Sequence, residues 1–142
     1  MEQKPGITWV AHQLLPGDST CATALASAAW SELPELQYQP CEGFLRGFTE
    51  AHEDSERVEF LAYNGPLLVG GGILVLEHDV HVGPCLSLAW QYVLPEYRHI
   101  GVVRRLHKVL VQSAKALNIP SIAYSHRIGT GEYITKYRRI HG

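Results

Sequence analysis

The chain has 142 residues, of which 46% are hydrophobic and 18% are charged, and its formal net charge is −2. This length suits one domain around one core, and we expect a single domain over residues 1–142. A charge so close to zero gives no general attraction to nucleic acid or to a membrane surface, so neither is expected as a partner. The longest apolar run, Leu67 to Leu76, is too short to span a bilayer. Three widely spaced cysteines and an N-terminus without a signal-peptide pattern predict a cytoplasmic protein.

Apolar runs alternate with turn residues along the chain, and this pattern predicts an α/β fold. Pro16-Gly17 ends the first apolar run, Asn64-Gly65 predicts a hairpin turn, and Pro120 follows a long amphipathic segment. The expected elements, in chain order, are a strand at 7–15, helices at 18–33 and 42–52, strands at 58–63, 67–77 and 85–93, a helix at 101–118, a strand at 121–125 and a helix at 132–140.

The most informative segment runs from Tyr92 to His107, where an apolar strand leads through a proline-containing turn into a helix that opens at Gly101. Arg98, Arg104 and Arg105 gather at this helix start. Cations there oppose the helix dipole, which favours negative charge at a helix N-terminus. Exposed N–H groups at a glycine-opened helix start also bind phosphate. The segment therefore predicts a strand, an anion-binding turn and a helix, with a phosphorylated cofactor as the ligand.

The stretch from Val93 to Val103, with the sequence VLPEYRHIGVV, resembles the central motif of the GCN5-related N-acetyltransferase (GNAT) superfamily. In that family an apolar strand precedes Pro-x-Tyr-Arg and then Arg/Gln-x-x-Gly-x-Gly/Ala. Arg98 and Gly101 match the first two anchors, and Val103 stands at the third. The resemblance implies acetyl-CoA as cosubstrate, with its pyrophosphate on the loop amides and its pantetheine arm on the main chain of the strand. The residues it assigns to the cosubstrate are Tyr92, Val93, Arg98, His99, Ile100, Gly101, Val102, Val103 and Arg104.

The resemblance also implies an acyl-CoA N-acyltransferase-like mixed sheet flanked by helices, in the order β-α-α-β-β-β-α-β-α. The family adds two strands after the last of these helices. The sequence given ends at Gly142, so we expect these terminal strands to be missing or truncated. A homo-oligomer could cover the sheet edge that this leaves exposed.

The implied activity is transfer of an acetyl group from acetyl-CoA to an amine, on a small molecule or on a protein, by direct attack. In many family members a tyrosine near the start of the last helix protonates the departing thiolate. The segment from Lys136 to His141, KYRRIH, resembles that helix start. The resemblance therefore assigns the catalytic role to Tyr137, with Tyr133 as the second candidate.

The place of the family's general base holds no carboxylate, because the register from Val93 puts Ala89 there. A base acting through water would come from Glu77, His78, Asp79 or His81. Ala89 and Val103 keep a second function open. The chain would then be a catalytically eroded domain of this fold that serves as a structural or binding module, for example in a virus or a mobile element.

Two other site types are disfavoured by the sequence. His78 and His81 lie three apart in a turn and make a poor metal site without further ligands, so no metal is expected. An unrelated nucleotide-binding α/β protein is disfavoured because the chain has no GxxxxGK[ST] loop and no GxGxxG after a strand.

Overall fold

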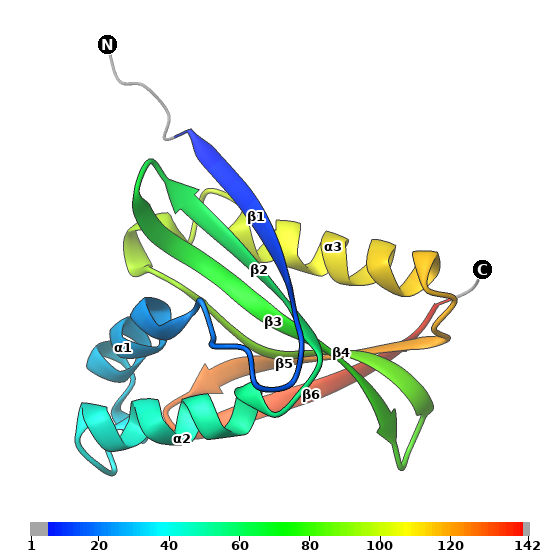
Figure 1. Ribbon diagram of the computed structural model, residues 1–142, viewed down its shortest axis with the longest axis horizontal. Helices are drawn as coiled ribbons and strands as arrows, with labels where there is room; N and C mark the ends of the chain where they lie inside the picture. The colour runs from blue at the N-terminus through cyan, green and yellow to red at the C-terminus, as the bar shows by residue number, and fades with distance from the viewer. Residues whose placement is uncertain (1–5, 141–142) are drawn as a thin grey trace.

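The computed structural model describes residues 6–140, which form one six-stranded sheet with helices on both faces (Figure 1). The strands are β1 (Ile7–Leu14), β2 (Arg57–Asn64), β3 (Leu67–Asp79), β4 (Gly83–Val93), β5 (Ser121–Gly129) and β6 (Glu132–Arg139). The helices are α1 (Thr23–Glu32), α2 (Cys41–Glu53) and α3 (Val102–Ala116), with two short 3-10 helices, η1 (Pro34–Leu36) and η2 (Pro95–Tyr97). No helix in this part of the chain is long and apolar enough to cross a membrane.

The strands lie in the sheet in their sequence order, β1-β2-β3-β4-β5-β6. Strands β1 to β4 pair antiparallel, and so do β5 and β6. Strands β4 and β5 run parallel because α3 carries the chain back between them. The β-α-β unit and the mixed α/β sheet that the sequence predicts are therefore confirmed.

The helices cover opposite faces of the sheet (Figure 1). On one face, α1 and α2 bury Leu25 and Phe48 against Ile73 of β3. On the other face, α3 packs through Leu106 and Leu110, neither of which is exposed to solvent. The apolar positions of α3 recur at helical spacing, so burying this stripe stabilises the helix and fixes its position on the sheet.

The glycine run in β3 allows close packing at the centre of the sheet. A Cβ atom on Gly71 would lie 2.7 Å from the carbonyl oxygen of Phe60, and one on Gly70 would lie 2.9 Å from Cγ1 of Val102. Larger residues would push β2 and the first turn of α3 away from β3. Because these glycines have no side chains, α3 can begin directly against the sheet.

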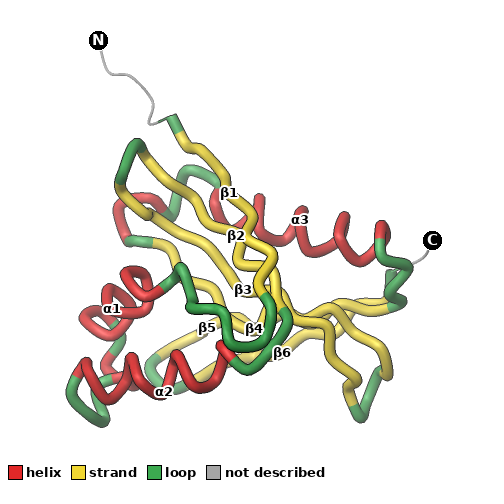
Figure 2. The backbone as a smooth tube through the Cα atoms, viewed as in Figure 1, coloured by secondary structure: helices red, strands yellow, loops and turns green. Residues whose placement is uncertain are grey.

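The helix predicted at 132–140 is wrong, because the chain forms the strand β6 there (Figure 2). Gly131 has a φ of 70° and closes a tight turn between β5 and β6. Tyr133, Ile134 and Thr135 are aromatic or β-branched and favour a strand. Pairing with β5, which runs to Gly129 instead of the predicted 125, decides in favour of the hairpin.

Candidate active site

Strands β4 and β5 separate in the middle of the sheet, and this split positions the site. Their parallel pairing ends at the pair Ser87–Ala123, although both strands continue for several residues. A bulge in the β3–β4 pairing leaves Ala89 without a partner and bends β4 at this level. Beyond the bulge, the described part of the sheet gives residues 90–93 a pairing strand on one side only. Their free backbone edge can hydrogen-bond to a ligand.

One side chain spans the split. Nε2 of Gln91 donates a hydrogen bond to the carbonyl oxygen of Ser125, at 3.1 Å, and ties β4 to β5 where their backbones no longer pair. The Oε1 atom of Gln91 is buried and has no hydrogen-bond partner within residues 6–140. A buried unpaired acceptor costs about 1–3 kcal/mol, so this oxygen is suited to accept a hydrogen bond from a ligand N–H.

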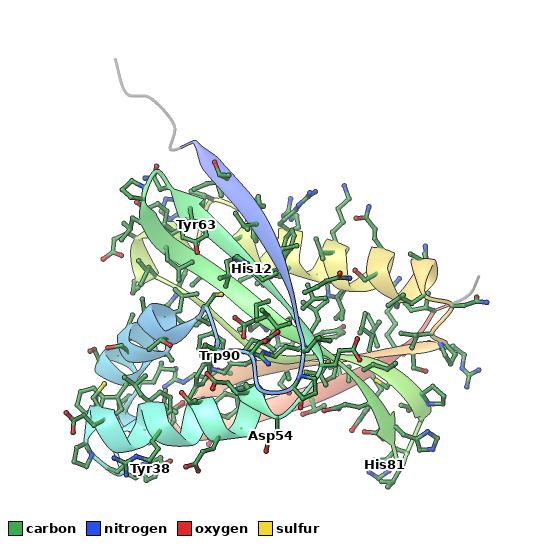
Figure 3. The ribbon with its side chains drawn as sticks, viewed as in Figure 1. His12, Tyr38, Asp54, Tyr63, His81 and Trp90 are labelled. Atoms are coloured by element: carbon green, nitrogen blue, oxygen red, sulfur yellow. The ribbon has the colours of Figure 1, made fainter. Side chains whose placement is uncertain are left out.

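A cavity of about 1030 Å³ occupies the split. Its lining includes Phe48 of α2 and Val103 of α3, so elements on both faces of the sheet contribute to it. Trp90 lies between the sheet and α2, within the lining (Figure 3). Ligand sites in proteins commonly measure about 300–1,000 Å³, so this cavity is large enough for an extended ligand that crosses the sheet.

The residues predicted to bind a cofactor lie between the end of β4 and the start of α3, and four of them line the cavity. Tyr92, Val93, Arg98 and Val103 line the cavity directly. Gly101 has a φ of 89°, a left-handed conformation that favours glycine, and it opens α3 without a side-chain cap. The first-turn amides of Val102, Val103 and Arg104 therefore have no helical acceptor. His99 is exposed beside them, whereas Ile100 packs on the core below α3.

Arg98, which is predicted to bind a phosphate, already pairs with a carboxylate. Its guanidinium donates two hydrogen bonds to the carboxylate of Glu32 at the end of α1, and its Nε donates to the carbonyl oxygen of Val93 at 3.1 Å. The hydroxyl of Tyr92 donates to the same carboxylate at 2.8 Å. The hydrogen bonds from Arg98 hold the pKa of Glu32 below its ordinary value. Any phosphate at Arg98 must compete with Glu32.

A second arginine–carboxylate pair lies across the same split. Arg127 of β5 donates to Glu35 in η1 through Nε at 2.6 Å and through Nη2 at 3.0 Å. The hydroxyl of Tyr133 donates to Glu35 at 2.8 Å. These contacts, with Arg127 as the largest cause, lower the pKa of Glu35 to about 2. The segment from Glu32 to Glu35 therefore binds the arginines on both sides of the split.

Tyr137 does not line this cavity. It lies on β6 opposite Ala123, and its hydroxyl donates to Asp79 at 3.2 Å, at the end of β3. The catalytic role predicted for Tyr137 depends on a helix beside the cleft, and that premise is wrong. The second candidate, Tyr133, does line the cavity. Burial and the Glu35 carboxylate raise the pKa of Tyr133, so its phenol stays protonated.

The predicted bases that would act through water lie away from the cavity. Asp79 and His81 belong to the tip of the β3–β4 hairpin, where Asp79 pairs with Gly83. Figure 3 shows His81 far from Trp90. No group of three potential metal ligands occurs within residues 6–140. The cavity instead contains His52, which the sequence analysis missed because a lone histidine in a helix carries no motif.

The ring of His52 has a defined tautomer. Its Nδ1 lies 2.8 Å from the carbonyl oxygen of Phe48, and a carbonyl only accepts hydrogen bonds, so Nδ1 carries a proton. In the neutral ring, Nε2 then keeps its lone pair. The His52 ring packs against Phe48 with centroids 4.4 Å apart, and Phe48 packs edge-on against Trp90 at 4.9 Å. The cavity therefore contains one well-oriented proton acceptor on α2.

Comparison with known proteins agrees with this architecture. The sequence model of the acetyltransferase (GNAT) family matches residues 22–129, which include every element from α1 to β5. The chain belongs to the GNAT family. No curated protein sequence matches the chain.

Solved structures of several acetyltransferases share the fold of this chain. A protein described as a predicted acetyltransferase from Clostridium acetobutylicum, solved with acetyl-CoA, has a TM-score of 0.61 at 17% identity over 87% of this chain and 82% of its own. The aminoglycoside N-acetyltransferase AAC(6')-Iy, in complex with CoA, has a TM-score of 0.59 at 17% identity over 87% and 80%. The ribosomal-protein-alanine N-acetyltransferase of Brucella melitensis biovar Abortus 2308 has 0.59 at 13% over 87% and 82%.

Proposed function

We propose that this GNAT chain transfers an acetyl group from acetyl-CoA to an amine by direct attack in a ternary complex. The observation that carries the proposal is the cavity in the β4–β5 split, which borders the motif residues Arg98 and Val103. A thioester carried on a long polar arm needs such a passage across the sheet. Neighbours of the same fold that were solved with acetyl-CoA or CoA support the choice of ligand.

The chain offers groups for each part of this ligand. The unpaired edge of residues 90–93 and Oε1 of Gln91 would bind the amides of the arm. The free first-turn amides of α3 would bind the pyrophosphate, with Arg98 released from Glu32. Val103 is 43% exposed, so its side chain can turn towards solvent without disturbing the core.

Two side chains of the cavity are suited to the two proton transfers of the reaction, deprotonation of the amine and protonation of the thiolate. Nε2 of His52 would take a proton from the amine, because Nδ1 is already committed to the Phe48 carbonyl. The Tyr133 phenol would return a proton to the departing thiolate, once its hydrogen bond to Glu35 is exchanged. Neither residue belongs to the motif that identifies the family.

Calorimetric titration with acetyl-CoA and with CoA tests the proposal. We expect saturable binding of both, and weaker binding to Arg98→Ala, because a charge-assisted hydrogen bond contributes about 1.5–3 kcal/mol. Thiol release from acetyl-CoA, followed with a panel of amines, then tests turnover. Absence of heat with either ligand would exclude the proposal.

One alternative function is favoured by specific contacts. Arg98 is occupied by Glu32, the base position holds Ala89, and the Tyr133 hydroxyl is engaged by Glu35. These features suit an eroded domain that binds a partner without turnover. Binding of CoA with no thiol release from acetyl-CoA for any amine would support this alternative.

A further inference from the structure

The part of the cavity that lies between the sheet and the two helices α1 and α2 is called here the acceptor chamber. Its walls are mainly apolar and aromatic. They are formed by Leu33, Leu36, Phe44, Phe48, His52 and Trp90. This chamber lies on the face of the sheet opposite α3, so a ligand that enters beside α3 leaves it free for the second substrate.

The rings of the chamber are packed in fixed orientations. Phe48 meets Trp90 edge-on with centroids 4.9 Å apart, and the ring of Phe44 lies 6.4 Å from that of Phe48. Phe44 and Phe48 are only 9% and 6% exposed, so neighbouring side chains hold them in place. Rigid aromatic walls bind flat apolar groups well, because little side-chain entropy is lost on binding.

The charges around the chamber cancel. Glu32 is the one carboxylate that lines the cavity within residues 6–140, and it is paired with Arg98. Glu35, behind the lining, is paired with Arg127. Two carboxylates and two guanidinium groups leave no net negative charge to attract several ammonium groups at once.

A phosphate bound at Arg98 would take up the positive charge that now neutralises Glu32, and would leave one negative charge on Glu32 unpaired. It would compete for the guanidinium, and the Glu32 carboxylate would lose its two hydrogen bonds from Arg98. One unpaired carboxylate beside the chamber then matches one ammonium group. The chamber is therefore suited to a single positive charge, and it should bind that charge more strongly after the phosphorylated ligand has bound.

We propose that the acceptor is a primary amine that carries one positive charge on a flat aromatic or compact apolar body. This inference rests on the proposed function. The ammonium group loses a proton to Nε2 of His52, and the nitrogen lone pair attacks the thioester carbonyl carbon. A C–N bond forms, the C–S bond breaks, and the nitrogen gives up its second proton as the amide forms. The departing thiolate takes up one proton, so the products are the amide and the free thiol, with the first proton left on His52. Polycationic acceptors such as aminoglycosides, which the AAC(6')-Iy neighbour is named for, find too few carboxylates here.

Binding of two probe amines tests this assignment. Phenethylamine and kanamycin are titrated into the free protein and into the protein saturated with CoA. We expect phenethylamine to bind at least about tenfold more tightly than kanamycin, a difference of about 1.4 kcal/mol. We also expect CoA to strengthen the binding of phenethylamine, because it releases Glu32.

A matched pair of variants locates the binding. Phe48→Leu removes an aromatic wall of the chamber, whereas Phe60→Leu makes the same change where Phe60 stacks on Trp9 of β1, outside the cavity. Phenethylamine affinity should fall about threefold to tenfold in Phe48→Leu and stay unchanged in Phe60→Leu.

The outcomes separate this inference from the proposed function. If CoA does not bind but phenethylamine binds and depends on Phe48, the chamber assignment stands and the acetyl-transfer proposal fails. If CoA binds and kanamycin binds as tightly as phenethylamine, or phenethylamine does not bind at all, the chamber assignment is overturned.

Discussion

The contact between Arg98 and Glu32 predicts that one substitution should improve ligand binding. In Glu32→Gln the carboxylate loses its charge, but the amide oxygen can still accept the hydrogen bond from Tyr92. Arg98 keeps its bond to the Val93 carbonyl and stays beside the cavity. The guanidinium is then free to meet a phosphate without first leaving a carboxylate.

The magnitude follows from the exposure of the pair. The side chain of Arg98 is 46% exposed and that of Glu32 is 30% exposed, so solvent screens their attraction. Exposed pairs contribute about 0.2–1 kcal/mol, and two-point geometry puts this pair near the upper end. A gain of about 1 kcal/mol corresponds to a dissociation constant for CoA about fivefold lower in Glu32→Gln.

Calorimetric titration with CoA at low and at high salt measures this effect. The advantage of Glu32→Gln should shrink at high salt, because both the pair and the phosphate contact are screened. Glu50→Gln is the control, since it makes the same charge change at an exposed position of α2 outside the cavity lining. An unchanged or weaker affinity in Glu32→Gln, or an equal gain in Glu50→Gln, would refute the reasoning.

Three further predictions concern catalysis, pH and packing. Tyr133→Phe should lower kcat by roughly tenfold or more while Tyr137→Phe leaves it unchanged, because only Tyr133 lines the cavity; equal losses in a thiol-release assay would contradict this. The pKa of Glu35 is lowered to about 2 in the folded state, whereas it is about 4.3 in the unfolded chain. The contact with Arg127 therefore stabilises the protein fully above about pH 4.3, and this stabilisation is lost as the pH falls from there towards 2. Urea unfolding should therefore show a stability advantage over Glu35→Gln at pH 7 that disappears on acidification, and an advantage independent of pH would count against it. Gly71→Ala should lower the free energy of unfolding by about 1–3 kcal/mol, because the new Cβ would lie 2.7 Å from a backbone carbonyl oxygen; a neutral result in the same unfolding assay would mean that β2 and β3 can separate without cost.

The fold was largely predictable where local patterns carry the information. The helix from 102 to 116 shows its apolar stripe directly, and Asn64-Gly65 marks the hairpin between β2 and β3. The loop that ends at Gly101 could be aligned with the family motif because glycine supplies the left-handed conformation. These features depend on neighbours in sequence, so the sequence alone reveals them.

The errors and omissions arise from contacts between distant residues. The segment after Gly131 matched the family's helix by its residue types, but pairing with β5 makes it a strand. Glu32 lies 66 residues from Arg98 in the sequence, so no local pattern predicts that Arg98 forms an ion pair with Glu32. The sequence does not indicate a role for His52, because that role depends on the Phe48 carbonyl that fixes its tautomer and on its position in the cavity lining.

Amide hydrogen exchange in the presence and absence of CoA tests most directly whether the ligand lies in the β4–β5 split. If CoA lies there, exchange should slow at residues 90–93 of β4 and at residues 99–104, while the amides of β1 stay unchanged. Protection confined to other elements, or no protection at saturating CoA, would contradict the placement of the ligand in the split.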